Sequence, residues 1–310
     1  MPIWSPKTAT GPTEVVHPYA SLAYAHALSH VGRPVAVPEW GVPVLARSLP
    51  RDLNPDPGGE DAMGLYPLTP LATTADLSGG LDRLRGLGLV SVVLVPDPLA
   101  EPPQQILSEA FTFVRPFKTH LTIDPARGRY SPSRHHAERI RRGHRRCRIK
   151  VGSLPLWLED WKRLYRGLVT RRSISGVAAF PDASFEIMGQ DPALAAFSAW
   201  IGDHIVGMTL WFACDGVIYN HLTAVDADGY ANGASFALYD TAIQHFEGRG
   251  VVNLGGGTGI GSGEGGLFAF KSGFANGEVM TSLCGAVLDP ARYAALSGGV
   301  ETEFFPAYRA

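Results

Sequence analysis

Short apolar runs alternating with helical patterns fill the first third of the chain. Residues 19–30 and 81–89 space their apolar side chains as helices do, and residues 91–97 form a short apolar run typical of a buried strand. Residues 112–124 alternate between apolar and polar positions, which predicts a further strand. Strands and helices that follow one another in this way indicate an α/β (α+β) fold.

The second half repeats the pattern with clearer turns. Residues 193–226 predict two or three antiparallel strands, with hairpin turns at the Gly-Asp pair 202–203 and the Asp-Gly pair 215–216. Apolar residues at helical spacing predict helices over 154–169 and 234–250. We expect mixed, mainly antiparallel sheets flanked by helices.

The length of 310 residues predicts two structural units. We place an N-terminal domain at 1–125 and a second domain at 126–290, because a strongly basic segment begins near residue 126. The last segment, 291–310, is expected to be a tail that packs back on the first domain.

Composition excludes several classes of protein. Apolar residues make up 45% and charged residues 18% of the chain, so it can bury a core and is not disordered. No apolar run reaches about 18 residues, and the first residues lack a secretory pattern, so we expect neither a membrane span nor a leader. Cys147, Cys214 and Cys284 are far apart and match no zinc or disulfide spacing, and no metal-binding motif occurs. A cytoplasmic location follows as the simplest expectation.

A basic segment from Arg127 to Lys150 holds ten Lys and Arg residues and one acid, whereas the remaining chain is acidic. Ser131 or Ser133 can cap a helix that runs to about Arg146. Guanidinium groups in a fixed row match phosphate oxygens, so the segment predicts a phosphate site; the alternative is a solvated surface helix. Four arginines share one arc of this helix and two lie beside it: Arg134, Arg141, Arg142 and Arg145, with Arg139 and Arg146.

Lys271 stands among aromatic residues, with Phe270 before it and Phe274 after it. A lysine held in this way is desolvated and needs an anion or a developing oxyanion as its partner. The alternative is a surface lysine that extends along apolar neighbours into water.

Polar side chains end the predicted strand at residues 219–226. Tyr219, Asn220, His221 and Thr223 can face a cleft there, and a histidine can exchange a proton near neutral pH. The alternative for His221 is a structural histidine whose hydrogen bonds are satisfied.

Glycine fills eight of the twelve positions from 255 to 266, directly after the predicted strand 251–254. Residues 261–266 match GxGxxG, but no strand with an acidic partner follows, so a dinucleotide site is disfavoured. The remaining interpretation is a loop in which Gly255 and Gly256 let the backbone approach a ligand.

The order of these motifs resembles one known family. The basic helix SPSRHHAERIRRGHRR, the strand IYNHLTAVD, the helix GASFALYDTAIQHFEGRG, the strand VVNLGGG and the closing LFAFKSGF follow one another. This order is similar to the Fem-type (FemABX-like) aminoacyl-tRNA-dependent transferases of the GNAT superfamily over residues 115–290. The resemblance implies two GNAT-like units, a degenerate one at 1–125 and a catalytic one at 126–290.

The resemblance also implies an activity. An amine of a small metabolite or cell-wall precursor would attack the ester of aminoacyl-tRNA and form an amide, without metal, cofactor or covalent intermediate. It implies Lys271, His221 and Tyr219 as catalytic residues and Arg134, Arg139, Arg142 and Arg145 as phosphate or tRNA contacts. The acceptor side or a close backbone approach would fall to Asn220, Thr223, Asp226, Gly255 and Gly256.

Two alternatives stay open at this point. Residues 229–234, GYANGA, are a degenerate form of the acyl-CoA loop of GNAT enzymes, so an acyl-CoA-dependent N-acyltransferase is the second hypothesis. The third is a non-catalytic nucleic-acid-binding protein that uses the basic helix.

Overall fold

The structure is a computed structural model that describes residues 17–50, 58–72, 74–100, 102–257, 265–299 and 302–310. The chain forms two compact units. Unit 1 comprises Lys118–Val279 with His17 and Pro18, and unit 2 comprises Tyr19–Phe117 and Met280–Ala310. We expected boundaries after residues 125 and 290. In the structure the chain passes from unit 2 to unit 1 inside strand β5 (Phe113–Ile123), after Phe117, and back to unit 2 inside strand β11 (Gly277–Val287), after Val279.

Unit 1 is built on a sheet with the strand order β5-β10-β9-β8-β7-β6. Neighbouring strands are antiparallel except β9 and β10, which run parallel. The strands are β5 (Phe113–Ile123), β6 (Arg148–Gly152), β7 (Leu194–Ile201), β8 (His204–Cys214), β9 (Val217–Val225) and β10 (Val251–Gly255).

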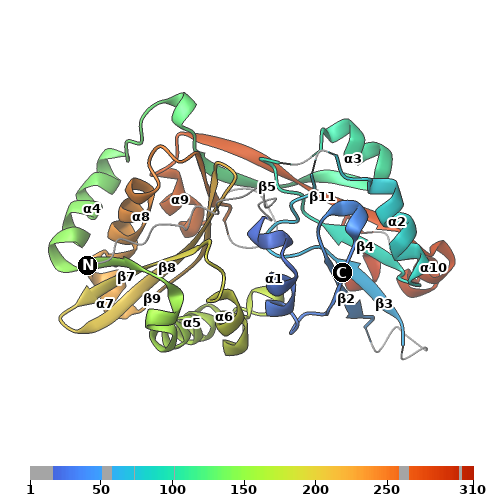
Figure 1. Ribbon diagram of the computed structural model, residues 1–310, viewed down its shortest axis with the longest axis horizontal. Helices are drawn as coiled ribbons and strands as arrows, with labels where there is room; N and C mark the ends of the chain where they lie inside the picture. Colours follow the sequence, from blue (N-terminus) through green and yellow to red (C-terminus); the bar gives the residue numbers. More distant parts are fainter. Residues whose placement is uncertain (1–16, 51–57, 73, 101, 258–264, 300–301) are drawn as a thin grey trace. The chain divides into compact units, whose positions relative to one another are not determined.

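Helices cover both faces of this sheet (Figure 1). One face carries α4, α8 and α9, and the other carries α5 and α6. The helices of unit 1 are α4 (Arg134–Arg146), α5 (Leu158–Arg172), α6 (Asp182–Met188), α7 (Ala227–Asn232), α8 (Ala234–His245) and α9 (Gly266–Ser272).

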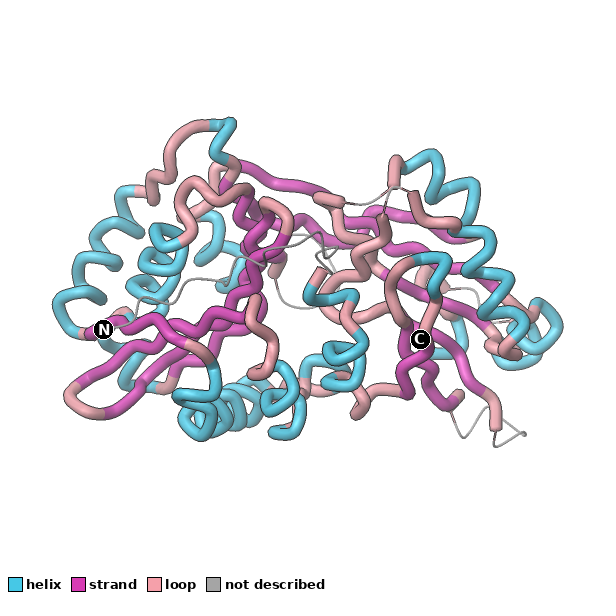
Figure 2. The backbone as a smooth tube through the Cα atoms, viewed as in Figure 1, coloured by secondary structure: helices cyan, strands magenta, loops and turns pink. Residues whose placement is uncertain are grey.

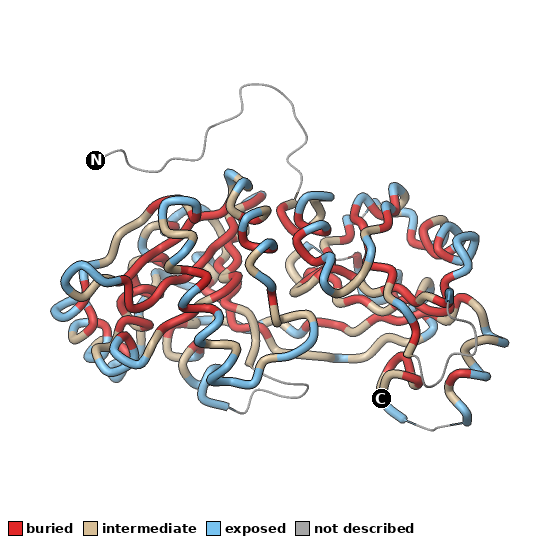
Figure 3. The backbone as a smooth tube through the Cα atoms, turned by 90° about the horizontal axis from the view of Figure 1, so that it is seen from below, coloured by how far each residue is buried: buried red, intermediate tan, exposed pale blue. Residues whose placement is uncertain are grey.

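Strand alternation divides the core of unit 1 into two layers. Trp211, Ile218 and Tyr239 are buried between the sheet and α8. Trp161 and Phe185 are buried under α5 and α6 on the opposite face. The central strands are therefore covered on both sides, as their burial in Figure 3 shows.

Unit 2 has the strand order β1-β2-β3-β4-β11, antiparallel except for the parallel pair β3 and β4. Helices again lie against the strands (Figure 2). The elements are β1 (Arg33–Val35), β2 (Val44–Ser48), β3 (Glu60–Met63), β4 (Ser91–Leu94), β11 (Gly277–Val287), α1 (Leu22–Ala27), α2 (Leu77–Gly86), α3 (Gln104–Ala110) and α10 (Pro290–Ser297).

The end of the chain is anchored to unit 2 through Asp61, whose side chain is fully buried. Tyr308 donates its hydroxyl hydrogen to this carboxylate over 3.0 Å, and Arg309 and Arg47 pair with it at 2.5 and 3.0 Å. Ser91 bonds the Tyr308 hydroxyl at 2.7 Å. The final residues therefore pack on the same unit as residues 19–117.

The predicted fold class is confirmed, since each unit is a mixed, mainly antiparallel sheet with flanking helices. The hairpins around Gly202 and Asp215 are also present, and both residues have positive φ. The sequence interpretation missed β6, α6 and α7, because these elements are only five to seven residues long and carry no sustained periodicity. No helix in the described ranges is long and apolar enough to cross a membrane.

Candidate functional site

Lys271 lies in the last turn of α9 with 7% of its surface exposed. Its Nζ donates a hydrogen bond of 3.0 Å to the carbonyl oxygen of Gly256. The neighbouring Phe270 packs against Tyr239 of α8, with 4.8 Å between the ring centroids, and fixes the short helix to the core. The lysine is therefore desolvated and held against the end of β10.

The glycines after β10 allow this close approach. Gly255 has φ +74°, and a Cβ there would lie 3.2 Å from Lys271 Nζ. A Cβ on Gly256 would lie 3.0 Å from the carbonyl oxygen of Thr119 and 3.4 Å from the ring of His120. Only a chain without side chains fits between Lys271 and β5 at this point. Residues 261–264 of the GxGxxG match lie outside the described residues.

Lys118 and His120 of β5 lie close enough to Lys271 for the charges to interact, and Asn253 of β10 bonds His120. The sequence analysis selected none of these three residues. Leu121 and Ile123 of β5 face the helix-covered core, so His120 lies on the opposite face by alternation. His120 and Asn253 are buried. The alternating polar positions of residues 118–122 were the signal that could have identified this side of β5.

The charges of this group shift each other's pKa. Burial and, to a smaller extent, the neighbouring charge of Lys118 together lower the pKa of Lys271 to about 7. The pKa of His120 is lowered to about 3, chiefly by burial and then by the charges of Lys271 and Lys118, while a hydrogen bond with Asn253 acts in the opposite direction. The imidazole is therefore neutral at physiological pH, and Lys271 changes charge near it.

The parallel strands β9 and β10 separate at this site. Their pairing ends at Tyr219 and Asn253, although β9 continues to Val225 and β10 to Gly255. The carbonyl that receives the Lys271 hydrogen bond lies beyond the point of separation.

Asn220 and Thr223 take part in a hydrogen-bond network on the α8 side of β9. Tyr239 donates to Asn220 Oδ1 over 2.6 Å, Asn220 Nδ2 donates to Thr209 over 3.1 Å, and the hydroxyls of Thr209 and Thr223 lie 2.7 Å apart. Trp211 Nε1 donates to the same Thr209 hydroxyl. The network joins β8, β9 and α8, so Asn220 and Thr223 help to hold these three elements together.

Tyr219 and His221 are both buried. Tyr219 contacts the His17 ring edge-on with centroids 5.0 Å apart. His221 packs on Phe212 and Phe180, with centroids 5.2 and 6.1 Å away, and burial lowers its pKa to about 3.

Asp226 ends β9 and begins the next helix. Its carboxylate accepts a hydrogen bond of 2.9 Å from the Gly229 amide and caps α7. This is the usual use of an aspartate at a helix start.

The basic helix α4 is joined to the helix that carries Lys271. Ser133 caps α4 as expected and donates its own amide to the carbonyl of Gly273, over 2.9 Å. His136 is 7% exposed, and its Nε2 lies 2.7 Å from the carbonyl oxygen of Phe270. The carbonyl has no proton, so Nε2–H is the donor, and Nδ1 lies 3.1 Å from the Ser133 hydroxyl.

The arginines of α4 fall into two groups. Arg142 donates to the carbonyl of Ala231 over 2.7 Å, and Arg139 lies over the Phe236 ring at 5.9 Å, so both face α7 and α8. Arg134 and Arg145 are exposed, as is Arg141 between them; Arg134 approaches Glu138 at 4.0 Å with its side chain 97% exposed. Arg139 and Arg146 are exposed as well, and Arg142 is the one half-buried arginine of α4.

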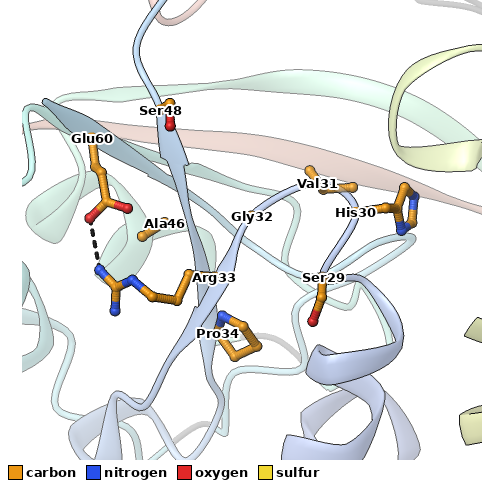
Figure 4. A pocket seen from close by; sticks show the side chains of 9 residues that line it. All are labelled: Ser29, His30, Val31, Gly32, Arg33, Pro34, Ala46, Ser48 and Glu60. Atoms are coloured by element: carbon orange, nitrogen blue, oxygen red, sulfur yellow. Dashed lines mark hydrogen bonds and ion pairs between the residues drawn. The ribbon is translucent and has the colours of Figure 1, made fainter. Parts of the chain in front are cut away.

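A separate open hollow lies in unit 2, between residues 29–32 and strands β1 to β3 (Figure 4). Its charged lining is the ion pair of Arg33 and Glu60, 2.7 Å apart.

Comparisons with known proteins connect this geometry to a fold. No protein-family model matches the chain, and no curated protein matches its sequence. The structure of FemX is similar with a TM-score of 0.61 and 11% identity, over 91% of this chain and 95% of FemX.

Two synthetase structures are similar as well. The C-terminal domain (DUF2156) of a protein assigned as a lysylphosphatidylglycerol synthetase, from Agrobacterium fabrum, has a TM-score of 0.59 and 15% identity, over 89% of this chain and 90% of that one. L-PGS from Bacillus licheniformis has a TM-score of 0.56 and 12% identity, over 86% and 92%. The chain thus shares the two-unit fold of FemX and these synthetases, and the Fem-type resemblance is confirmed at the level of the fold.

Proposed function

We propose that the protein is an N-acyltransferase that moves an aminoacyl group from aminoacyl-tRNA to the amine of a small metabolite or cell-wall precursor. The observation that carries the proposal is the buried Lys271, held at the glycine end of β10 where β9 and β10 separate. The shared fold supports it, because the lysylphosphatidylglycerol synthetases are named for an aminoacylated product.

The reaction needs a positive group beside the carbonyl oxygen that becomes negative. The acceptor amine attacks the ester carbonyl, a C–N bond forms, and the carbonyl electron pair moves to oxygen. Collapse of this intermediate expels the ribose oxygen, which receives the proton that the amine loses. Lys271 stabilises the oxyanion, and one such donor in a dry site is worth about 10²–10³ in rate.

The charge state of Lys271 suits this task. With a pKa of about 7 the amine is partly protonated at neutral pH. A negative charge that develops beside it raises that pKa and favours the ammonium form. Most of the remaining rate comes from holding two substrates together, because esters already react with amines.

The outward arginines of α4 support a polyanionic donor. Arg134, Arg141 and Arg145 form an exposed row on a helix that is joined to α9 through His136. We assign phosphate binding to this row. Arg142 holds α4 against α7 through its hydrogen bond to the Ala231 carbonyl.

Packing at the start of α8 favours tRNA over acyl-CoA as the donor. Gly233 lies in the degenerate GNAT loop 229–234, and a Cβ there would lie 3.5 Å from backbone atoms of Arg139 and Gly143. A Cβ on Gly143 would in turn lie 2.5 Å from the Gly233 carbonyl oxygen. The α4 backbone occupies the space beside this turn, which leaves little room there for a CoA pyrophosphate.

The test is an assay of the pure protein with charged tRNA pools, acyl-CoAs and candidate amines, read by mass spectrometry. Phosphatidylglycerol vesicles are added as a separate arm, in view of the synthetase fold. We expect product with charged tRNA and none after ribonuclease treatment. Product from acyl-CoA alone would refute the tRNA donor and favour the second hypothesis.

Variants separate catalysis from simple RNA binding. Lys271→Met should lower transfer at least about 100-fold without loss of tRNA binding. Lys150→Met is the matched control, because Lys150 is on β6, away from Lys271, with its amine over the ring of Trp200 on β7. Full biological activity of Lys271→Met would favour the non-catalytic nucleic-acid-binding hypothesis.

A reversal of charge on α4 tests the tRNA surface. Arg134→Glu with Arg145→Glu should weaken tRNA binding and reduce its salt dependence by about two phosphate contacts, with little change in stability. Unchanged binding would remove α4 from the proposal.

A further inference from the structure

Tyr230 in α7 carries the one exposed aromatic ring among the described residues. Every other Phe, Tyr and Trp side chain in the described ranges is buried or half-buried, whereas 48% of the surface of Tyr230 is accessible. A single exposed apolar side chain is common on protein surfaces. The contacts of this ring, however, hold it in a fixed position beside the basic helix.

The ring of Tyr230 is supported on one face by Arg171 of α5. The guanidinium carbon of Arg171 lies 5.5 Å from the ring centroid, and Nη2 of the same residue donates a hydrogen bond of 2.7 Å to the carbonyl oxygen of Val225. Because this hydrogen bond fixes the guanidinium, the attraction between cation and ring also fixes the ring. The one acid of α7, Asp228, lies about 200° around the helix axis from Tyr230, so its side chain leaves the helix on another side. The accessible face of the ring is therefore free for a ligand that tolerates positive charge nearby.

The helix that carries Tyr230 is bound to the basic helix α4. Arg142 donates to the carbonyl oxygen of Ala231 over 2.7 Å, and Arg146 donates to Oδ1 of Asn232 over 3.2 Å. Both acceptors follow Tyr230 directly in α7. A polyanion that lies along α4 therefore comes next to the exposed ring.

Tyr230 is also within electrostatic range of the core beside Lys271. The pKa of Tyr239 is raised mainly by burial, while a hydrogen bond with Thr223 lowers it and the charge of Tyr230 raises it. Tyr239 in turn packs on Phe270, the residue before Lys271, with 4.8 Å between the ring centroids. The exposed ring is therefore close to a residue that holds α9 and its lysine in place.

We propose that Tyr230 stacks against an unpaired base of the donor tRNA, with Arg171 as the rigid support of its ring. Every base has a π face, so this contact needs no particular nucleotide sequence. The end of a tRNA that carries the ester is single-stranded, so an unpaired base is present next to the reacting group. The stacking contact is separate from the phosphate contacts of α4. The inference rests on the proposed function, because tRNA is the donor there.

The experiment measures binding of the full-length protein to uncharged tRNA and to two RNA hairpins with the same stem, one blunt and one that ends in unpaired nucleotides. Loss of one stacked base weakens binding about 5- to 150-fold, so Tyr230→Ala should weaken binding of tRNA and of the overhanging hairpin within that range. The salt dependence should stay unchanged, because no phosphate contact is lost. The blunt hairpin should bind wild type and variant equally.

Further variants separate stacking from a merely structural role. Tyr230→Phe keeps the ring and should retain the binding, whereas Tyr230→Leu keeps an apolar side chain without a π face and should bind as weakly as Tyr230→Ala. In Tyr230→Trp the additional indole emission should be quenched by tRNA and by the overhanging hairpin. Leu156→Ala is the matched control, because Leu156 is 67% exposed and has no ring, so its loss should leave the affinity unchanged.

Several results would overturn the inference. They are absence of tRNA binding by the wild type, equal affinity of wild type and Tyr230→Ala for tRNA, and an equal loss on the blunt and the overhanging hairpin. Quenching of Tyr230→Trp by CoA but not by either RNA would assign the ring to a CoA adenine and overturn it as well.

The result is separable from that of the transfer assay. Weaker tRNA binding by Tyr230→Ala, together with absence of aminoacyl transfer by the wild type, retains the stacking contact and refutes the proposed function. Transfer by Tyr230→Ala with unchanged kcat and unchanged KM for charged tRNA retains the function and refutes the stacking contact.

Discussion

Gly273 leaves room for the His136 ring, through which α4 packs against α9. Substitution of Gly273 by alanine tests this contact, here called the joint between α4 and α9. The glycine has φ −71°, so alanine causes no backbone strain there. A Cβ at this position would however lie 2.1–2.3 Å from three atoms of the His136 ring. Gly273→Ala must therefore displace the imidazole.

The cost follows from the contacts that the ring makes. His136 loses its hydrogen bonds to Phe270 and Ser133, worth about 1 kcal/mol each. It also loses edge-on contacts with Phe274 and Phe236, at 4.8 and 5.1 Å between centroids, worth about 0.5–1.5 kcal/mol each. We expect a destabilisation of about 3 kcal/mol, which lowers the Tm of unit 1 by about 6–12 °C.

The assay is thermal unfolding together with aminoacyl transfer. Gly167→Ala is the matched control, because Gly167 lies inside α5 with nothing within 4 Å of an added Cβ. That control should be stabilised by about 0.5–1 kcal/mol through helix propensity. Since α9 carries Lys271, we expect Gly273→Ala also to lower kcat more than tRNA affinity.

A Gly273→Ala protein as stable as the Gly167→Ala control would show that His136 does not fill this space. A stable protein with reduced tRNA affinity and unchanged kcat would contradict the link between the joint and Lys271.

Three further substitutions test the electrostatics of the fold. The pKa of Lys271 is lowered to about 7 in the folded state, so its burial at pH 7 costs stability, and this cost disappears as pH rises towards 10.5. In urea unfolding at pH 7, Lys271→Met should therefore have a free energy of unfolding about 2–4 kcal/mol higher than that of the wild type. The pKa of His221 is lowered to about 3, so its neutral form does not reduce stability above about pH 6.5, and stability falls as pH decreases towards 3. His221→Phe should therefore reduce the dependence of the free energy of unfolding on pH between pH 6.5 and 5 by about 1.4 kcal/mol per pH unit. An unchanged dependence would contradict the burial of His221. Asp61→Ala leaves Arg47 and Arg309 facing each other without their shared carboxylate, so the free energy of unfolding of unit 2 should fall by about 3–5 kcal/mol. Arg33→Ala breaks an exposed ion pair and is the control; a smaller fall for Asp61→Ala than for this control would show that the C-terminal anchor is unimportant.

Local signals fixed several elements in advance. Ser133 capped the basic helix because a serine side chain satisfies free amides at a helix start wherever that helix lies. The turns at Gly202 and Asp215 were predictable because few residue types tolerate a positive φ. The desolvation of Lys271 followed from the aromatic residues beside it in the chain.

Contacts between distant segments decided the rest. The arginines of α4 have the same sequence chemistry, yet Arg142 bonds the end of α7 while Arg145 is exposed, because the approach of α4 to α7 and α8 depends on Gly143 and Gly233. The sequence likewise did not show that Asn220 accepts a hydrogen bond from the Tyr239 hydroxyl.

The sequence by itself determined the α/β character, the basic helix and the buried lysine, because these depend on periodicity, capping and near neighbours in the chain. Only the tertiary structure brought Lys118 and His120 close to Lys271, and Asn253 to His120. The partners lie up to about 150 residues away in the chain, and strand pairing and burial, which bring such residues together, leave no local pattern.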